Sequence, residues 1–170
     1  REDIMPALDG KAFVCACLNA NDPLKDMRMV LQECKDMGVN SVSNVGPSIS
    51  YVDKDSEIYN VLTSTGVTLQ NEIEMLKLAR EEMDMVSIGL AFTKEDSLAI
   101  VEGARPHIFC YHAGTTKGGL TGYDNGSTIE QTAAESEDVY AAVRKIDPNV
   151  ILVGHGAAME TPEDAQYMLD

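Results

Sequence analysis

Apolar and polar positions along the chain fall into blocks that predict alternating strands and helices. Short apolar runs bounded by turn residues are separated by longer segments in which apolar residues recur every three or four positions. The short runs predict strands over residues 12–18, 39–45, 85–92, 108–111 and 150–153. Runs of this kind are typical of strands that are buried on both faces of a parallel sheet.

The segments between these runs predict helices with recognisable start signals. They cover residues 23–37, 54–62, 69–83, 94–103, 127–146 and a last segment from Thr161. Asn21 or Asp22 is expected to cap the first helix, with Leu24 on its inward face. Ser127 and Glu130 are expected to form a capping box for the long helix, because a hydroxyl and a carboxylate at this spacing can each accept a hydrogen bond from the other's backbone N–H.

The alternation of strands with helices predicts an α/β fold with a parallel sheet and right-handed crossovers. A chain of 170 residues is expected to form a single domain over residues 1–170. Two architectures fit this order: an open doubly wound sheet, or part of a (β/α)8 TIM barrel. A complete barrel usually needs about 250 residues, so the second alternative means an incomplete barrel with about five β-α units.

In both architectures the functional site lies at the carboxyl ends of the strands, which meet at one edge of the sheet. The residues of interest at or just after these ends are Asn19, Asn21, Asp22, Asn44, Phe92, Thr93, His112 and His155. The two long or irregular connections, over 46–68 and 113–127, also follow strands and therefore lie at this edge. Extra loop length there is more often functional than structural.

The segment over 107–126, HIFCYHAGTTKGGLTGYDNG, carries the strongest functional signal. His112 stands where a strand is expected to end, and a loop rich in glycine and threonine follows it. The loop contains Gly114, Thr115, Thr116, Lys117, Gly118, Gly119, Thr121, Gly122 and Gly126. Glycines let successive backbone N–H groups turn toward one point, and such a concavity binds phosphate or carboxylate. The alternative is a flexible loop beside a structural histidine.

His112 and His155 follow consecutive strands, and each is closely followed by a glycine. Because neighbouring parallel strands lie about 4.8 Å apart, the two imidazoles can share one pocket. There they can transfer protons, bind an anion or hold a metal ion. The alternative is that both rings cap the core through hydrogen bonds to the backbone. His107 lies at the opposite end of its strand and is expected to be structural.

Other charged residues have simpler interpretations. Glu72 lies near the start of the helix over 69–83, where a carboxylate interacts favourably with the helix N-terminus. Asp22 is more typical of a helix cap than of a ligand. Lys117 can pair with a substrate anion, but an exposed lysine on a loop is also commonplace.

Composition narrows the range of functions. The formal net charge is -15, which argues against nucleic-acid binding and against binding to an anionic membrane surface. No apolar run in the sequence reaches the length of a membrane span. The four cysteines lack the paired spacing of a zinc site and are expected to be reduced thiols of a cytoplasmic protein.

Several segments resemble one known family. Residues 112–119, HAGTTKGG, are similar to the H-x-G-x-T-x-G-G signature of the phosphoenolpyruvate hydrolase-like family of TIM barrels, and Gly122 extends the match. The other similar segments are 21–23, 71–75, 150–156 and 161–169. Two departures lie at the expected site. Residues 155–158 read HGAA where the family has HGGP, and residues 44–50 differ from its usual pattern.

The resemblance implies a barrel in which these strands are the third to the seventh. It implies an enzyme acting on a small phosphorylated or carboxylated three-carbon metabolite, with His112, His155 and Glu72 as catalytic residues. The implied substrate-binding residues are Asp22, Asn44, Gly114, Thr115, Thr116, Gly118, Gly119 and Gly156. A divalent metal such as Mg²⁺ is compatible with the kinship, although the residues define no ligand set, and a homo-oligomer is expected. Because the family also includes a plant domain that is not obviously an enzyme, a non-catalytic barrel that senses a ligand or docks a protein is the alternative.

Overall fold

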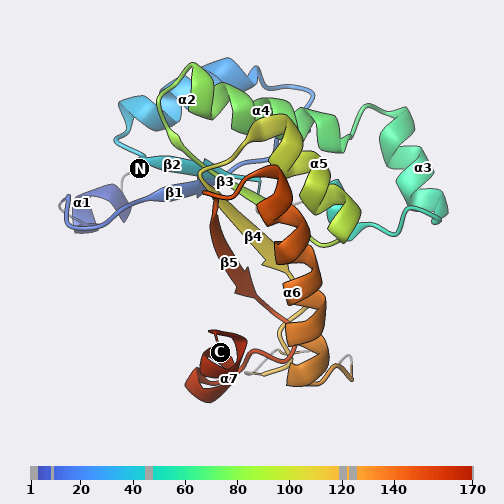
Figure 1. Cartoon of the computed structure of the whole chain (residues 1–170). Helices are drawn as coiled ribbons and strands as arrows, with labels where there is room; N and C mark the ends of the chain where they lie inside the picture. Colours follow the sequence, from blue (N-terminus) through green and yellow to red (C-terminus); the bar gives the residue numbers. More distant parts are fainter. Residues whose placement is uncertain (1–3, 9, 45–47, 119–121, 123–125, 170) are drawn as a thin grey trace.

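The computed structural model describes residues 4–8, 10–44, 48–118, 122 and 126–169 (Figure 1). The strands are β1 (Cys15–Cys17), β2 (Ser41–Ser43), β3 (Val86–Ala91), β4 (Ile108–His112) and β5 (Ile151–His155). The helices are α1 (Ile4–Leu8), α2 (Met27–Asp36), α3 (Glu57–Ser64), α4 (Leu69–Glu81), α5 (Lys94–Ala104), α6 (Ile129–Ile146) and α7 (Pro162–Leu169), with a short 3-10 helix, η1, at Ile49–Tyr51. Strands and helices therefore alternate as the sequence pattern predicts.

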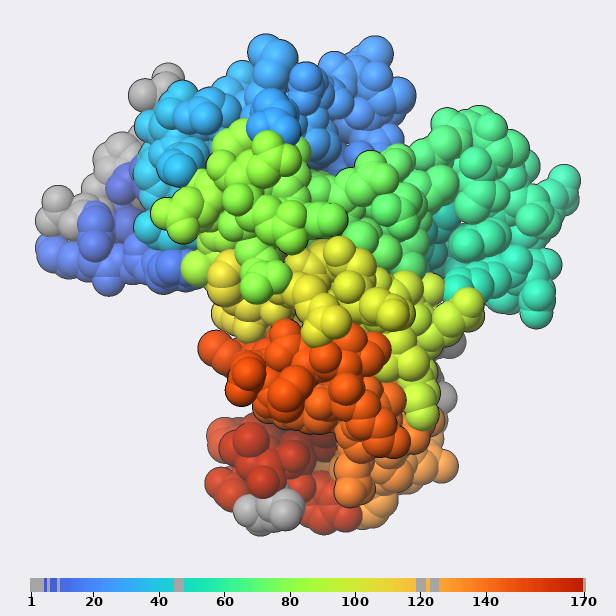
Figure 2. Space-filling view, turned by 45° about the horizontal axis from the view of Figure 1, so that its top comes forward, coloured from blue at the N-terminus to red at the C-terminus, as the bar shows by residue number. Residues whose placement is uncertain are grey.

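All five strands pair in parallel in one sheet, in the order β1-β2-β3-β4-β5. Helices α2, α4, α5 and α6 pack side by side in chain order and form a continuous layer (Figure 2). A doubly wound sheet has a strand order that reverses and helices on both faces, so the described part of the chain does not have that architecture. In the described ranges, none of the helices is both long enough and apolar enough to cross a membrane.

Side-chain alternation turns one face of the sheet toward the helix layer. On this face Val42 packs against α2 and α4, and Phe109 packs with Val139 of α6. Gly89 lies on the same face, where an added Cβ would lie 2.7 Å from Ile100 Cγ2 of α5. A glycine is therefore needed at this position for α5 to approach β3 so closely.

The opposite face, here called the open face, is exposed at both edges of the sheet. It carries the in-register side chains of Cys15, Cys17, Ser41, Ser43, Val86, Ile88, Leu90, Ile108, Cys110, His112, Ile151, Val153 and His155. On β5, Ile151 is 58% exposed and Val153 is 45% exposed. Apolar side chains on this face are thus in contact with solvent along the last strand.

The first strand differs from its prediction. Residues 12–18 are predicted as a buried strand, whereas β1 pairs only over Cys15–Cys17, and Phe13 just before it is 62% exposed. Cys15 and Cys17 are free thiols and are also exposed. The prediction of burial was wrong because β1 is an edge strand that pairs only with β2.

Helix α2 begins later than predicted. Asp26 is its cap, with a carboxylate that accepts a hydrogen bond from Arg28 N at 2.9 Å. Asp22 instead closes a turn by accepting from Leu24 N at 3.0 Å. The prediction of Asn21 or Asp22 as the cap was therefore wrong, and Leu24 lies outside the helix with 90% of its surface exposed.

The capping box of α6 lies one residue away from its prediction. The hydroxyl of Thr128 accepts from Gln131 N at 3.3 Å, and the Gln131 side chain accepts from Thr128 N at 3.0 Å. Ser127 and Glu130 do not form the box. The predicted end of this helix near Ile146 is confirmed.

A buried hydrogen-bond network joins β2, β3 and α4 at the carboxyl edge of the sheet. The Asn44 amide accepts from Leu90 N at 2.7 Å, and it donates to Leu90 O at 2.9 Å and to Glu72 Oε2 at 2.6 Å. Glu72 is only 2% exposed, and its carboxylate also accepts from Ser48 Oγ at 2.8 Å and Ile49 N at 3.0 Å. A buried carboxylate needs such donors, so Glu72 fixes the start of η1 to α4.

Replacing Glu72 with alanine should lower the free energy of unfolding by about 3 kcal/mol, because buried donors lose a charged acceptor and a cavity is left. Glu72→Gln keeps the shape but loses one acceptor, so it should cost about half as much. The control is Glu74→Ala, an exposed position on the same helix that should change stability by less than about 0.5 kcal/mol. Urea unfolding followed by circular dichroism measures all three variants. Equal stability of Glu72→Ala and Glu74→Ala would contradict the role given to the network.

Candidate functional site

Two histidines meet at the carboxyl edge of the sheet. β4 and β5 pair in register from Ile108 opposite Ile151 to His112 opposite His155. Because paired residues of parallel strands point to the same face, both imidazoles project from the open face. Their ring centroids lie 4.2 Å apart, with the ring planes at 64°. The structure therefore brings together the two histidines that the sequence singles out.

Contacts with the backbone fix the His112 ring. Gly114 N donates to His112 Nδ1 at 3.2 Å, so the neutral ring carries its proton on Nε2. Gly156 lies against the same ring with a φ of +95°. A Cβ on Gly156 would lie 3.1 Å from two atoms of that ring and would overlap Gly114 O. Glycine can adopt this left-handed backbone conformation, and without a Cβ it lets the backbone lie this close to the ring. Other residues would be strained and would clash here.

The loops after β4 and β5 are joined by backbone hydrogen bonds. Ala113 N donates to His155 O at 3.1 Å. Ala157 N donates to Gly114 O at 2.9 Å, and Lys117 N donates to Ala157 O at 2.9 Å. The backbone N–H groups of Gly114 and Lys117 thus already donate hydrogen bonds to other groups of the protein. An anion bound at this loop would depend on the loop's other donors.

Four aromatic rings form a row along this edge, here called the ring row. The centroids of Tyr51 and Phe92 lie 5.0 Å apart, and those of Phe92 and His112 lie 4.5 Å apart. His155 completes the row through its contact with His112. The row therefore links η1, the end of β3, and the ends of β4 and β5 by direct ring contacts.

Two cavities of about 470 Å³ each adjoin the ring row, and Tyr51, Phe92 and His112 line both of them. The first cavity is completed by Thr115, Thr116, Gly118 and Gly122. The second is completed by Ser50, Val52, Asp53, Lys54, Thr93, Ala113 and Gly114. The glycine and threonine loop thus shares a cavity with His112, as the sequence predicts.

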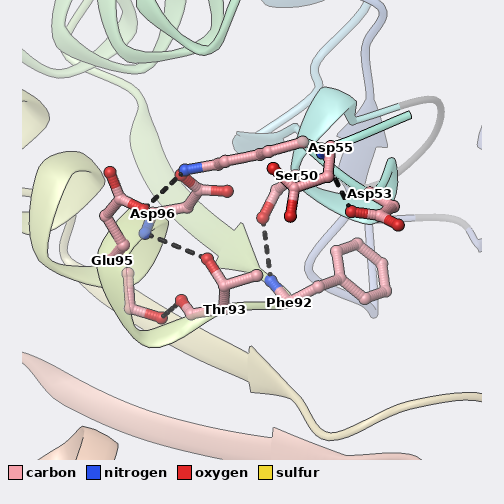
Figure 3. A network of polar contacts seen from close by, with 9 residues as sticks. Ser50, Asp53, Asp55, Phe92, Thr93, Glu95 and Asp96 are labelled. Carbon is pink, nitrogen blue, oxygen red and sulfur yellow. Dashed lines mark hydrogen bonds and ion pairs between the residues drawn. The ribbon is translucent and has the colours of Figure 1, made fainter. Parts of the chain in front are cut away.

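The segment 48–54 contributes to the site. It lies in the connection over 46–68 that the sequence places at this edge, although none of its side chains was named as a candidate. Ser50 Oγ accepts from Phe92 N at 3.0 Å, and Lys54 Nζ lies 2.8 Å from Asp96 Oδ1 (Figure 3). Asp96 is 3% exposed, so this ion pair attaches the segment to the start of α5. The sequence signal for these side chains was weak, because it consisted of an aromatic residue and a lysine in a long connection after a strand.

Burial sets the ionisation of the two histidines. It lowers the pKa of His112, and the neighbouring His155 lowers that pKa further. Burial also lowers the pKa of His155. Both rings are therefore neutral at pH 7, which is the state in which an imidazole can both donate and accept a proton.

Two charged side chains near the ring row, one partly exposed and one buried, have pKa values that are raised for different reasons. Burial opposes the charge of Lys54, but hydrogen bonds to Asp96 and Glu95 outweigh it and raise the pKa of this lysine. Burial raises the pKa of Glu72, although the hydrogen bond from Asn44 partly opposes it. Lys54 is therefore a cation whose charge is already compensated by two carboxylates.

Some predicted site residues do not join the histidines. Asp22 lies in the connection between β1 and α2 and lines a separate cavity that includes Asn71 of α4. Asn44 and Glu72 bind each other, and the described lining of the two cavities beside the ring row does not include them. Gly119 lies outside the described residues. In these positions, Asn44 and Glu72 hold the segment 48–54 in place.

A bound metal ion was left open by the sequence. Within the ranges that the structure describes, no three side chains of histidine, cysteine, aspartate or glutamate come together in a way that could hold a metal ion.

Comparison with known proteins covers the whole chain. A family model described as phosphoenolpyruvate hydrolase-like matches residues 1–170. Two curated proteins of tomato, Solanum lycopersicum, are each 27% identical to the chain over 167 residues: ToMV susceptible protein tm-1(GCR26) and ToMV resistance protein Tm-1(GCR237). The match covers 98% of this chain and 21% of each tomato protein, so the chain spans about a fifth of the length of these relatives. Since the family model extends from the first residue to the last, the chain belongs to the phosphoenolpyruvate hydrolase-like family.

Proposed function

We propose that this chain carries the site of an enzyme that acts on a small phosphorylated or carboxylated three-carbon metabolite by histidine acid–base catalysis. The observation that carries the proposal is the His112–His155 pair, with ring centroids 4.2 Å apart at the carboxyl edge of a parallel sheet. Two neutral imidazoles at this separation can move a proton to and from a bound ligand. Membership of the family supports the class of substrate.

The two histidines have different parts in this chemistry. Since Nδ1 of His112 accepts a hydrogen bond from Gly114 N, its Nε2–H is the proton that it can offer. Donated toward a ligand carbonyl oxygen, it stabilises the negative charge that develops as the carbonyl takes on enolate character. Partial desolvation lowers the pKa of His155, and its neutral ring is the base that removes the proton from the neighbouring carbon.

The loop after β4 supports binding of an anion. Thr115, Thr116 and Gly118 line the same cavity as His112, so hydroxyl and backbone donors lie beside the reacting ring. Lys54 lines the neighbouring cavity, but it is paired with two carboxylates of α5. The hydrogen-bond donors of the loop and the two histidines therefore stabilise most of the ligand's negative charge.

We also propose that the sheet is part of a (β/α)8 barrel, as its third to seventh strands. The sequential strand order and the helix layer on one face support this architecture. The exposed apolar side chains of Ile151 and Val153 on the open face support it as well. In a closed barrel this face is the packed interior, and further strands cover both edges of the sheet.

A second candidate is a non-catalytic barrel that senses a ligand or docks a protein. The names of the tomato relatives favour it, because they refer to ToMV susceptibility and resistance and not to a reaction. In this case the cavities beside the ring row would bind a ligand without converting it. Conversion of the ligand is thus the outcome that separates the two candidates.

Closure of the barrel should protect the thiols of Cys15 and Cys17 in the full-length protein. Both thiols are exposed on the open face of the sheet, so they become covered when further strands close the barrel. Alkylation by iodoacetamide, followed by peptide mass spectrometry, should be at least about tenfold slower in the native protein than in urea. Equally fast alkylation of both thiols in the native protein would contradict the barrel.

Replacing His112 or His155 with glutamine should lower turnover of phosphoenolpyruvate by the full-length protein by about 100-fold or more, the usual contribution of an acid or base. Products are followed by NMR spectroscopy, and binding is measured by calorimetry. His107→Gln is the matched control, because His107 accepts from Ser87 N at the other end of β4 and should retain turnover.

Two results would reject parts of this assignment. Unchanged turnover in both His112→Gln and His155→Gln would show that the pair is not catalytic. Binding of phosphoenolpyruvate to the unmodified protein without any product would favour the ligand-sensing candidate.

Affinity for a small anion should rise as the pH falls from about 7.5 to 5.5. The lowered pKa values keep both histidines neutral in the free protein, and an anion favours the protonated form, so binding takes up a proton. Oxalate stays ionised throughout this range, and its affinity should increase by up to about tenfold per pH unit. Calorimetry at several pH values measures the slope. The double variant of His112→Gln and His155→Gln should have none, and a pH-independent affinity in the unmodified protein would refute the coupling.

A further inference from the structure

The two cavities beside the ring row differ in polarity. The one that contains Thr115 and Thr116, here called the threonine cavity, has more polar than apolar surface. The one that contains Val52, here called the aromatic cavity, has mainly apolar surface. Because Tyr51 and His112 line both, the two cavities adjoin along the ring row. A single ligand can therefore place a polar end in one cavity and an apolar end in the other.

Tyr51 presents a fixed but exposed ring to both cavities. It is 64% exposed, although its ring contacts that of Phe92 with the centroids 5.0 Å apart. Its backbone N–H donates to Ser48 O at 3.2 Å. The adjacent Ser50 Oγ accepts from Phe92 N at 3.0 Å, which attaches this turn to the end of β3 (Figure 3). A tyrosine held in this way offers rigid apolar contact area at a small entropic cost, which is typical of recognition surfaces.

A bare three-carbon acid leaves the aromatic cavity unfilled. A water molecule occupies about 30 Å³ of the liquid, so at a similar volume per non-hydrogen atom phosphoenolpyruvate needs about 300 Å³. Each cavity has a volume of about 470 Å³, which is within the range of sites for small molecules. The threonine cavity alone can thus hold such an acid, and the aromatic cavity is left for a further part of the ligand.

Charge decides what this further part is. Asp53 lines the aromatic cavity, and Lys54 in the same lining pairs with Asp96 at 2.8 Å. A second acid group placed here would meet a carboxylate of like charge and a lysine whose charge is already compensated. The part of the ligand in the aromatic cavity is therefore uncharged, whereas the acid group lies at the threonine cavity.

We propose that the site takes a 2-oxo acid with an aromatic ring on its third carbon, and that this ring packs against Tyr51 and Phe92 in the aromatic cavity. The assignment rests on the proposed function, since the carbonyl group of the acid then lies at His112. Contacts between aromatic rings are more favourable than their apolar area alone accounts for, so these side chains select a ring over an aliphatic group of similar size. Tyr51 is thereby a specificity-determining residue.

An aryl-substituted 2-oxo acid also suits the two histidines. His155 takes a proton from the carbon between the ring and the carbonyl, and the electron pair of that C–H bond forms a C=C bond. The carbonyl oxygen takes up the negative charge, and the Nε2–H of His112 donates a hydrogen bond to it. The aromatic ring is conjugated with the new double bond and lowers the cost of forming this enolate.

The test compares phenylpyruvate with pyruvate, which is the same acid without the ring, by calorimetry on the full-length protein. Burial of the ring should make phenylpyruvate bind at least about tenfold more tightly. Tyr51→Ala should weaken the binding of phenylpyruvate by about tenfold and change that of pyruvate by less than about twofold. Tyr51→Phe keeps the ring and should bind both acids as the unmodified protein does. Tyr167→Ala removes a tyrosine of α7 that is 49% exposed, and is the matched control without effect.

A measurement on the unmodified protein guards against an effect of Tyr51→Ala on folding. With ¹³C-labelled methyl groups of valine and threonine, NMR spectroscopy should show a saturable ring-current shift at Val52 with phenylpyruvate and none with pyruvate. The methyl groups of Thr115 and Thr116 should shift with both acids, because both place their acid group at the threonine cavity.

Three results would overturn the proposal: equal affinity for the two acids, no shift at Val52, or unchanged affinity of Tyr51→Ala for phenylpyruvate. Failure of the proposed function gives a different result. Phenylpyruvate then binds with the shift at Val52, but the protein does not accelerate exchange of the hydrogens on its third carbon in D₂O. Turnover of phosphoenolpyruvate without preferential binding of phenylpyruvate would reject the aromatic substrate and keep the proposed function.

Discussion

The in-register pairing of β4 with β5 is the contact on which the candidate site depends. A shift by one residue would turn His155 to the helix-covered face and separate it from His112. Tyr140 of α6 opposes such a shift, because its hydroxyl donates to Val153 O at 2.9 Å. A Cβ at Gly154 would overlap the same hydroxyl, so the close approach of Tyr140 to β5 requires a glycine at this position. The geometry of the imidazole pair on the open face thus depends on α6, which packs on the opposite face and sets the register of β5.

The other side of the site depends on a buried charge. The segment 48–54 contains only one turn of 3-10 helix, so contacts with other elements decide its position. Glu72 holds its beginning, and the pair of Lys54 with Asp96 holds its end. Each of these carboxylates is nearly inaccessible to solvent, and the donors around it offset the cost of burying it. Tyr51 is carried into the ring row because both ends of its segment are fixed.

The sequence predicts those parts of the site that local patterns determine. The strand ends, and hence the meeting of His112 with His155, follow from apolar runs and from the rule that parallel strands end at one edge. The pattern is ambiguous where two local signals compete: residues 127–131 read STIEQ, and either Ser127 or Thr128 can begin a capping box. The connection over 46–68 was expected at this edge, but the side chains of 48–54 that build the site were not identified, because their hydrogen bonds span 24 and 42 positions, which no local pattern records. Burial of β1 was predicted wrongly because apolar content does not distinguish an edge strand from a central one.

Charge limits the ligands that this edge of the sheet can accept. Lys54 is the permanently cationic side chain in the described lining of the two cavities beside the ring row, and two carboxylates compensate it. With a net charge of -15, the protein as a whole also repels anions. A multiply charged ligand would therefore gain little Coulombic energy, and dipoles and proton uptake by the histidines must hold a small acid. Binding energy from an uncharged part of the ligand can replace the missing Coulombic attraction and hold the reacting group in place. Under the proposed function, the side chains of Tyr51, Val52 and Phe92, which line a cavity together with His112, can supply such a contact without adding charge to an already acidic molecule.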